Sequence, residues 1–320
     1  LVDAGGKPLK RCSGFWIDWN EESKTGIVLT TAHLIRTKNS PVNIWLGGEE
    51  YASHANITVH LQDGTSPEGQ LLYYQPHYDL AFVRVRVDEH VELPFFQEEV
   101  KLAQEVFRLG RDNMLDLRIT YGWAEYENPT IYERYHNMYF NSAGGAKDDK
   151  EYDNGGLVID LDGKVLGMSN NIKSGTFIPS SILLKCVDLW KKYECYIPRP
   201  HLGMTFEAIK LLEPSHVEKL WRMYNIDDGL VVQQVSKGSH AEKFGIQRGD
   251  IIECINGKCI STTIELENVL ASICKDSSDN LNDLNVEIHV SVGVFHTLKK
   301  HRTTGELPAS VSDLGEVIMD

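Results

Sequence analysis

Two titratable side chains, His33 and Asp79, stand at the borders of apolar runs in the sequence. His33 lies near the end of the run VLTTAHLI, and Asp79 directly precedes LAFVRV. Both patterns predict polar groups at strand edges, where a rigid scaffold can hold them. An imidazole acting as a general base and a carboxylate fixing its tautomer are two of the three groups that serine-type acyl transfer needs. Either residue alone is more often structural, whereas the ordered pair with these flanks indicates a catalytic arrangement.

The third group would be a nucleophile at a tight glycine turn. The stretch EYDNGGLVID contains such a turn at Gly155 and Gly156, followed by an apolar strand, but the residue before it is Asn154. A carboxamide has no ionisable hydroxyl and is a very poor nucleophile. The chain order of histidine, aspartate and nucleophile loop is that of chymotrypsin-type barrels. The sequence therefore predicts a hydrolase site whose attacking atom is missing.

The elements that would position these groups are short strands. Apolar or alternating runs, separated by clusters of Gly, Asn, Asp and Pro, fill residues 12 to about 190 and predict an all-β sandwich or barrel. The stretch SSILLKCVDLWKKY has helical spacing, and the prolines of YIPRP, residues 196–200, indicate a linker. Helix and strand signals then alternate, with one helix near 264–275. The polar stretch 301–320 is expected to be a partly flexible tail.

Composition narrows the possible partners. The chain has 320 residues, enough for two domains that each bury a core. Its formal net charge of -14 disfavours binding to nucleic acid or to an anionic membrane. No window reaches the roughly 18 uninterrupted apolar residues of a membrane span. No GxGxxG, P-loop or HExxH pattern occurs, so we expect no cofactor and no metal.

The cysteines bear on the compartment. None of the six forms a CxxC pair, and Cys254 and Cys259 enclose the turn INGK, which favours a hairpin with two incidental thiols over a metal site. This usage indicates a reducing compartment, and we expect an intracellular protein, in the cytoplasm or nucleus rather than secreted. The stretch LVDAGGKPLKR has no apolar signal core, although a removed targeting segment stays open.

Several motifs together resemble one family. The chain is similar to trypsin-like serine proteases of the HtrA/Deg (protease Do-like) family that carry one PDZ domain. The matching stretches are SGFWID, GIVLTTAHLI, DLAFVRV, VFRLGR, TYGWAEY, GGLVIDLDGKVLGMSNN, FIPSS, PRPHLGM and GLVVQQVSKGSHAEKFGIQRGDIIECINGKCI. The resemblance implies a mostly β fold, a trypsin-like double β-barrel followed by an α+β PDZ domain. We expect the protease domain at 1–195, the PDZ domain at 196–300 and a tail at 301–320.

The resemblance also assigns roles within the first domain. His33 corresponds to the catalytic base and Asp79 to its orienting carboxylate. The family pattern Gly-Asn-Ser-Gly-Gly-Pro aligns with residues 152–157, which places Asn154 at the nucleophile position and Gly155 in the oxyanion loop. Tyr152 replaces a glycine whose N–H helps bind the oxyanion, and Asp153 adds a negative charge beside it.

Two interpretations follow from these departures. The one we favour is a catalytically impaired pseudoprotease that acts as a protein- or peptide-binding scaffold. An engineered loss of a native serine at Asn154 is disfavoured, because Tyr152 and Leu157 also depart from the pattern. The alternative is an active serine endopeptidase of protein quality control or regulatory proteolysis, in which Ser142 of FNSAGG supplies the nucleophile. An extra alanine and the charged AKDDK are more typical of a loop than of a nucleophile turn.

The PDZ half matches its family pattern without such departures. A PDZ domain binds a peptide C-terminus as an added strand, and a loop of backbone N–H groups holds the terminal carboxylate. The resemblance implies that Leu202, Gly203 and Met204 form this loop and that a helix carrying Leu266 and Leu270 lines the groove. The alternative is that these residues only pack a core. Family members also assemble as trimers, which implies a homo-oligomer that could mix with active paralogues.

Overall fold

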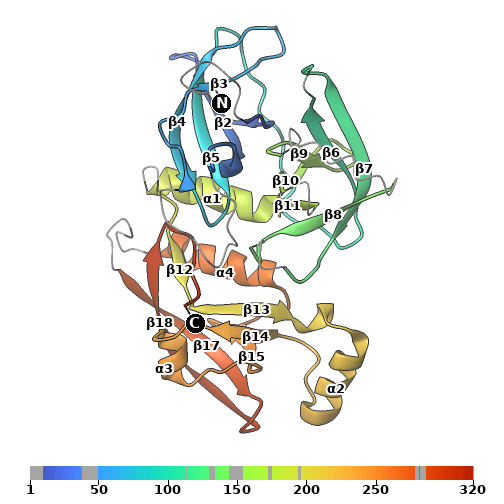
Figure 1. Cartoon of the computed structure of the whole chain (residues 1–320), viewed down its shortest axis with the longest axis vertical. Helices are drawn as coiled ribbons and strands as arrows, with labels where there is room; N and C mark the ends of the chain where they lie inside the picture. Colours follow the sequence, from blue (N-terminus) through green and yellow to red (C-terminus); the bar gives the residue numbers. More distant parts are fainter. Residues whose placement is uncertain are drawn as a thin grey trace. The chain divides into compact units, whose positions relative to one another are not determined.

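The computed structural model describes residues 10–37, 50–112, 114–129, 134–143, 154–171, 175–193, 196–277, 281 and 286–319. They fall into two compact units (Figure 1). Of the described residues, the first unit contains those within 10–126 and 137–184, and the second contains those within 127–136 and 185–319. Within this described part, no helix is both long enough and apolar enough to span a membrane.

The first unit is built from two β-sheets. An antiparallel sheet has the strand order β1-β2-β5-β4-β3, and a closed barrel has the order β10-β11-β8-β7-β6-β9. The strands are β1 (Phe15–Asn20), β2 (Thr25–Thr31), β3 (Ile57–Thr58), β4 (Glu68–Gln75), β5 (Leu80–Arg86), β6 (Glu105–Arg111), β7 (Leu117–Glu125), β8 (Met138–Ser142), β9 (Leu157–Ile159), β10 (Val165–Asn171) and β11 (Thr176–Pro179). Helix α1 (Ser180–Lys192) follows, where helical spacing predicted it. The prediction of a mostly β first half is confirmed.

Strand β5 explains how this unit positions a functional group. It is hydrogen-bonded to β2 on one side and to β4 on the other, and its apolar side chains are buried while Arg84 and Arg86 are exposed. Because β5 begins at Leu80, the preceding residue Asp79 is fixed at the end of a central strand. Burial of β5 therefore explains two things: the alternation of apolar and exposed residues in its sequence, and the fixed position of Asp79.

The second unit is one twisted sheet with helices. Its strand order is β12-β18-β17-β15-β14-β13, and β16 pairs with β15. The strands are β12 (Arg199–His201), β13 (Met204–Ala208), β14 (Leu230–Val235), β15 (Ile251–Ile255), β16 (Lys258–Cys259), β17 (Glu287–His296) and β18 (His301–Ser312). The helices are α2 (Pro214–Tyr224), α3 (His240–Phe244) and α4 (Thr263–Asp276).

Two expectations about chain segments are corrected here. The stretch 301–320, predicted to be a polar tail, begins with the long strand β18, in which Leu307, Ala309 and Val311 alternate with more exposed residues and are buried. The stretch 196–200, predicted to be a linker, contributes Arg199 to strand β12, which pairs with β18. In β18 the polar composition concealed a period of two, and in β12 the prolines concealed a short strand of three residues.

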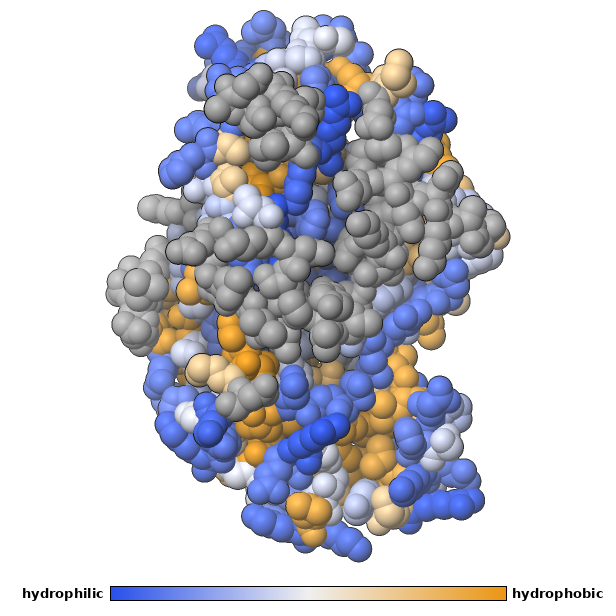
Figure 2. Space-filling view, in the orientation of Figure 1, coloured by the Kyte–Doolittle hydropathy of each residue, from blue (hydrophilic) through white to orange (hydrophobic). Residues whose placement is uncertain are grey.

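Strand β13 lies at the edge of its sheet and pairs only with β14 among the described strands. Helix α4 packs next to β12 and β13 (Figure 1). Its N-terminus is fixed by a capping box between Thr262 and Glu265. The visible surface is mainly hydrophilic, with hydrophobic side chains emerging on parts of the second unit (Figure 2).

Candidate active site

His33 lies in a short 3₁₀ turn, Ala32–Leu34, that directly follows β2. The Thr31 hydroxyl caps this turn by accepting a hydrogen bond from the His33 backbone N–H at 3.1 Å. At the other end, the Lys10 ammonium donates to the His33 carbonyl at 3.0 Å. The backbone of His33 is therefore held on both sides, and a cation stands close to it.

Asp79 reaches the same turn from β5. Its carbonyl accepts from the Ala32 N–H at 3.0 Å, and its Oδ2 accepts from the Thr31 hydroxyl at 2.6 Å. Its backbone has φ 54, in the left-handed region that few non-glycine residues adopt. Burial raises the pKa of the Asp79 carboxyl to about 6, although the Thr31 hydroxyl and the Arg36 charge oppose that shift. The carboxyl is therefore shielded from water while it keeps polar and charged neighbours.

The Asn154–Gly155 turn docks against β2 and the segment before β1. The Asn154 carbonyl accepts from the Ser13 N–H at 2.7 Å, and the Gly155 N–H donates to the Ser169 carbonyl at 2.6 Å. Gly155 has φ 79, and a Cβ there would meet the Ser13 carbonyl oxygen at 2.1 Å and Thr30 Oγ1 at 2.5 Å. Only glycine satisfies both the conformation and the contact.

The fold thus brings the three predicted positions to one place. Gly155 approaches Thr30, while Asp79 binds the side chain of Thr31, and both threonines lead directly into the turn that carries His33. Asn154 is buried beside them. The predicted oxyanion-loop residues Tyr152 and Asp153 lie outside the described residues.

Ser142, the alternative nucleophile, is positioned differently. It ends strand β8 and pairs with Gly122 of β7 in the barrel ladder. Its backbone is therefore part of a β-strand rather than of the glycine turn that contacts Thr30.

Cys12 is a potential nucleophile beside this site that the sequence motifs did not single out. Its Sγ lies 3.0 Å from Thr30 Oγ1, and the Asp79 charge acts on it. Burial raises the pKa of the Cys12 thiol to about 11. At neutral pH it is a protonated thiol, which is a weak nucleophile. Only its position before the run SGFWID could have pointed to it.

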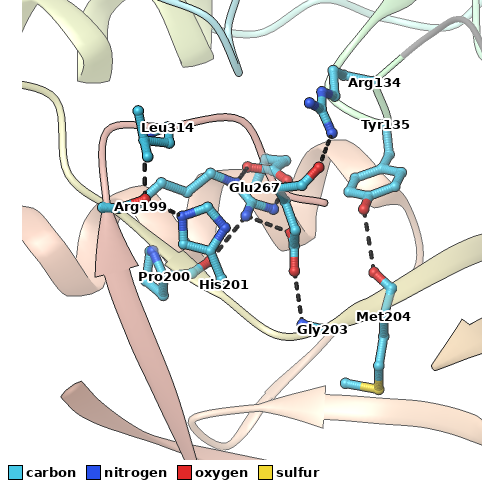
Figure 3. Close-up of polar contacts among 11 residues, drawn as sticks. Arg134, Tyr135, Arg199, Pro200, His201, Gly203, Met204, Glu267 and Leu314 are labelled. Carbon is cyan, nitrogen blue, oxygen red and sulfur yellow. Dashed lines mark hydrogen bonds and ion pairs between the residues drawn. The ribbon is translucent and has the colours of Figure 1, made fainter. Parts of the chain in front are cut away.

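The second predicted site lies in the second unit. Gly203, between Leu202 and Met204, has φ 70, and its N–H donates to Glu316 Oε1 at 2.7 Å (Figure 3). Leu266 and Leu270, predicted to line the groove, are fully buried in α4. The buried side chain of Arg199 joins Glu316 to Glu267 of α4 and was not singled out from the sequence, because its stretch was interpreted as a linker.

Comparisons with known proteins agree with this architecture. Residues 12–168 match the family model of the trypsin-like peptidase domain, and residues 231–277 match that of the PDZ domain. The fold resembles that of the HtrA-type protease AlgW, solved with a tripeptide, at TM-score 0.55 and 18% identity, over 93% of this chain and 88% of that one. The chain therefore has a mostly β, trypsin-like domain that contains a β-barrel, together with a PDZ domain, as the sequence predicted.

Curated relatives specify the family. A probable periplasmic serine endoprotease DegP-like from Pseudomonas fulva is 25% identical over 94% of this chain and 57% of its own length. The serine protease Do-like HtrA from Bacillus subtilis is 23% identical over 81% of this chain and 57% of its own length. The chain belongs to the HtrA/Deg family, and it spans just over half the length of these relatives.

The relatives contradict the expected intracellular location. Several are named periplasmic endoproteases, which points to a secreted or periplasmic setting. The inference from cysteine usage was wrong for a physical reason. Cys186 and Cys274 are buried thiols, and burial raises the pKa of Cys274 to about 12, so free thiols of this kind are protected by the fold and do not indicate the compartment.

A pair of glycine substitutions tests why the nucleophile loop keeps its turn. Gly155→Ala should destabilise the protein by about 1 kcal/mol for its positive φ and by about 1–3 kcal/mol more for the overlap with Ser13 and Thr30. Gly163→Ala is the matched control, because Gly163 has φ 81 and a Cβ added to it would meet nothing within 4 Å. Urea unfolding measures both. Equal losses would contradict the packing requirement.

Because the pKa of the Asp79 carboxyl is raised, the stability of the folded protein should depend on pH. Its folded pKa of about 6 exceeds the ordinary 3.8, so the folded state binds the proton more tightly. This contribution to stability is present below about pH 4 and is lost as the pH rises through 6, by about 3 kcal/mol. Asp79→Asn cannot ionise, so its stability relative to the unsubstituted protein should rise by that amount between pH 4 and 7. A difference that stays constant with pH would refute the shift.

Proposed function

We propose that this chain is a catalytically impaired HtrA/Deg-like pseudoprotease that acts as a protein- or peptide-binding scaffold through its PDZ domain. The observation that carries the proposal is Asn154. It occupies the nucleophile position, on a glycine turn docked beside His33 and Asp79, and it has no hydroxyl to attack a peptide bond.

The surroundings of this position add support. The nearby Cys12 is a protonated thiol at neutral pH, because burial raises its pKa to about 11. Cys12 therefore does not compensate for the missing serine. Burial raises the pKa of the Asp79 carboxyl only to about 6, so this group is largely ionised at neutral pH, and the departure from a catalytic triad lies at Asn154 rather than at Asp79.

The competing function is an active serine endopeptidase. Ser142 would then be the nucleophile, although its place in the β7–β8 ladder disfavours this role. The two functions predict opposite results with a fluorophosphonate probe, which labels only activated serines.

We expect the purified protein neither to react with a fluorophosphonate nor to cleave reduced casein above background. The variants His33→Ala and Ser142→Ala serve as controls and should give the same blank result. Labelling or cleavage that is lost in both variants would establish the endopeptidase. Activity lost in His33→Ala alone would equally overturn the pseudoprotease.

The partners follow from the same family membership. The PDZ domain supports binding of protein or peptide C-termini, and the structural neighbour AlgW was solved with short peptides. We further propose a homo-oligomer, a trimer by resemblance, that could mix with active paralogues and reduce their activity.

Light scattering tests the assembly. At micromolar concentration we expect a mass about three times the 36.2 kDa of the chain. A monomer across that concentration range would contradict the trimer and its mixing with paralogues, while leaving peptide binding by the PDZ domain unaffected.

A further inference from the structure

We propose that Glu316 is an internal ligand of the PDZ carboxylate site, so that this chain closes its own peptide groove and a partner C-terminus must displace it. The inference rests on the proposed peptide-binding function and adds the identity of the competitor. It also assigns Arg199, together with the Gly203 N–H, as the receptor for the carboxylate of the incoming peptide.

The contacts of Glu316 are those that a peptide C-terminus would need. One carboxylate oxygen, Oε1, accepts from the Gly203 N–H at 2.7 Å, and the other, Oε2, accepts from Arg199 Nη1 at 2.6 Å (Figure 3). Gly203 belongs to the loop that PDZ domains use to hold a terminal carboxylate. Here a side-chain carboxylate of the same chain fills that position.

The charges around Glu316 explain why the site demands an anion. Arg199 is fully buried and also makes a two-pronged contact with Glu267, through Nε at 3.0 Å and Nη2 at 2.6 Å. Buried Arg134 donates to the Glu316 carbonyl at 2.8 Å. Burial lowers the pKa of the nearby His201 to about 4, so this imidazole is neutral at neutral pH. Removing the Glu316 carboxylate would take from Arg199 one of the two carboxylates that contact it among the described residues, a loss that a new carboxylate would make good.

The edge strand β13 is covered as well. A peptide added to this strand would use its outward backbone groups. The Ala208 N–H already donates to Asn128 Oδ1 at 2.9 Å, and the Met204 carbonyl accepts from the Tyr135 hydroxyl at 3.2 Å. The Tyr135 ring also packs edge-on against Phe206 of this strand. Each is a neutral contact, weaker than the charge-assisted bonds of Glu316, so Glu316 is the main closure.

The segment that carries Glu316 is anchored at both ends. Before it, the Leu314 N–H donates to the Ser312 hydroxyl at 3.2 Å. After it, the Met319 N–H donates to the Ser236 hydroxyl at 2.9 Å, and the Met319 carbonyl accepts from the Lys237 N–H at 2.8 Å. The carboxylate is thus delivered by an ordered segment, and a competitor must release the contacts of that segment.

The first experiment tests the receptor without any peptide. Glu316→Ala should have a lower melting temperature than the unsubstituted protein, and sodium acetate should raise it again more than sodium chloride at equal ionic strength. Glu306→Ala, which removes an exposed glutamate of β18, is the control and should show no selective effect of acetate. Acetate that stabilises Glu316→Ala no more than this control would overturn the receptor assignment.

The second experiment tests competition with a peptide. A pool of random decapeptides with free C-termini should bind full-length Glu316→Ala at least about tenfold more tightly than the unsubstituted protein. The same pool with amidated C-termini should lose this gain. Glu316→Gln, which keeps the size of the side chain but not its charge, should behave like Glu316→Ala and serves as the substitute if the alanine variant does not fold.

The outcomes separate the two proposals. One outcome is that free-carboxylate peptides bind tightly, amidated peptides do not, and the variants bind no better than the unsubstituted protein. This outcome would overturn the internal ligand and leave the peptide-binding function intact. Free and amidated pools that bind alike to every protein would overturn carboxylate capture and this inference with it.

Discussion

The second unit depends on how one buried guanidinium is neutralised. Arg199 comes from β12, and its two counter-charges come from α4 and from the segment after β18. A charge removed from water is tolerated only with well-placed partners, so these three elements must hold fixed positions relative to one another. The loop at Gly203 is tied into the same network through Glu316. The shape of the peptide groove and the identity of its occupant therefore follow from one ion-pair cluster.

In the first unit, packing and chemistry make separate demands on the same loop. The turn at Gly155 is required because Ser13 and Thr30 lie against it, and its hydrogen bond to Ser169 ties it to β10. None of these backbone contacts involves the side chain at position 154. The barrel can therefore close around an asparagine as well as around a serine, and a catalytic scaffold can persist after its attacking group is gone.

Much of this could be predicted from the sequence, because several signals were local. The apolar run after Asp79 marked a buried strand, and the spacing of Leu266 and Leu270 marked α4. The failures were non-local. Arg199 lies in a proline-rich stretch, and Glu316 lies in a polar one, so neither segment has a composition that suggests burial. Their importance arises only when β12 pairs with β18 and brings both to one loop. Likewise, nothing in the local sequence around Asn128 and Tyr135 indicates that these two side chains will contact β13.

The cover on β13 has a second consequence, which concerns solubility. An exposed edge strand offers unsatisfied backbone groups to any other strand, including the same edge of another copy. Asn128 and Tyr135 occupy two such groups, so the closed groove also shields the protein from edge-to-edge aggregation. A groove that opens without a peptide to fill it exposes an edge strand that can pair with another copy. Resistance to aggregation therefore favours a direct exchange of occupants over a groove that stays empty.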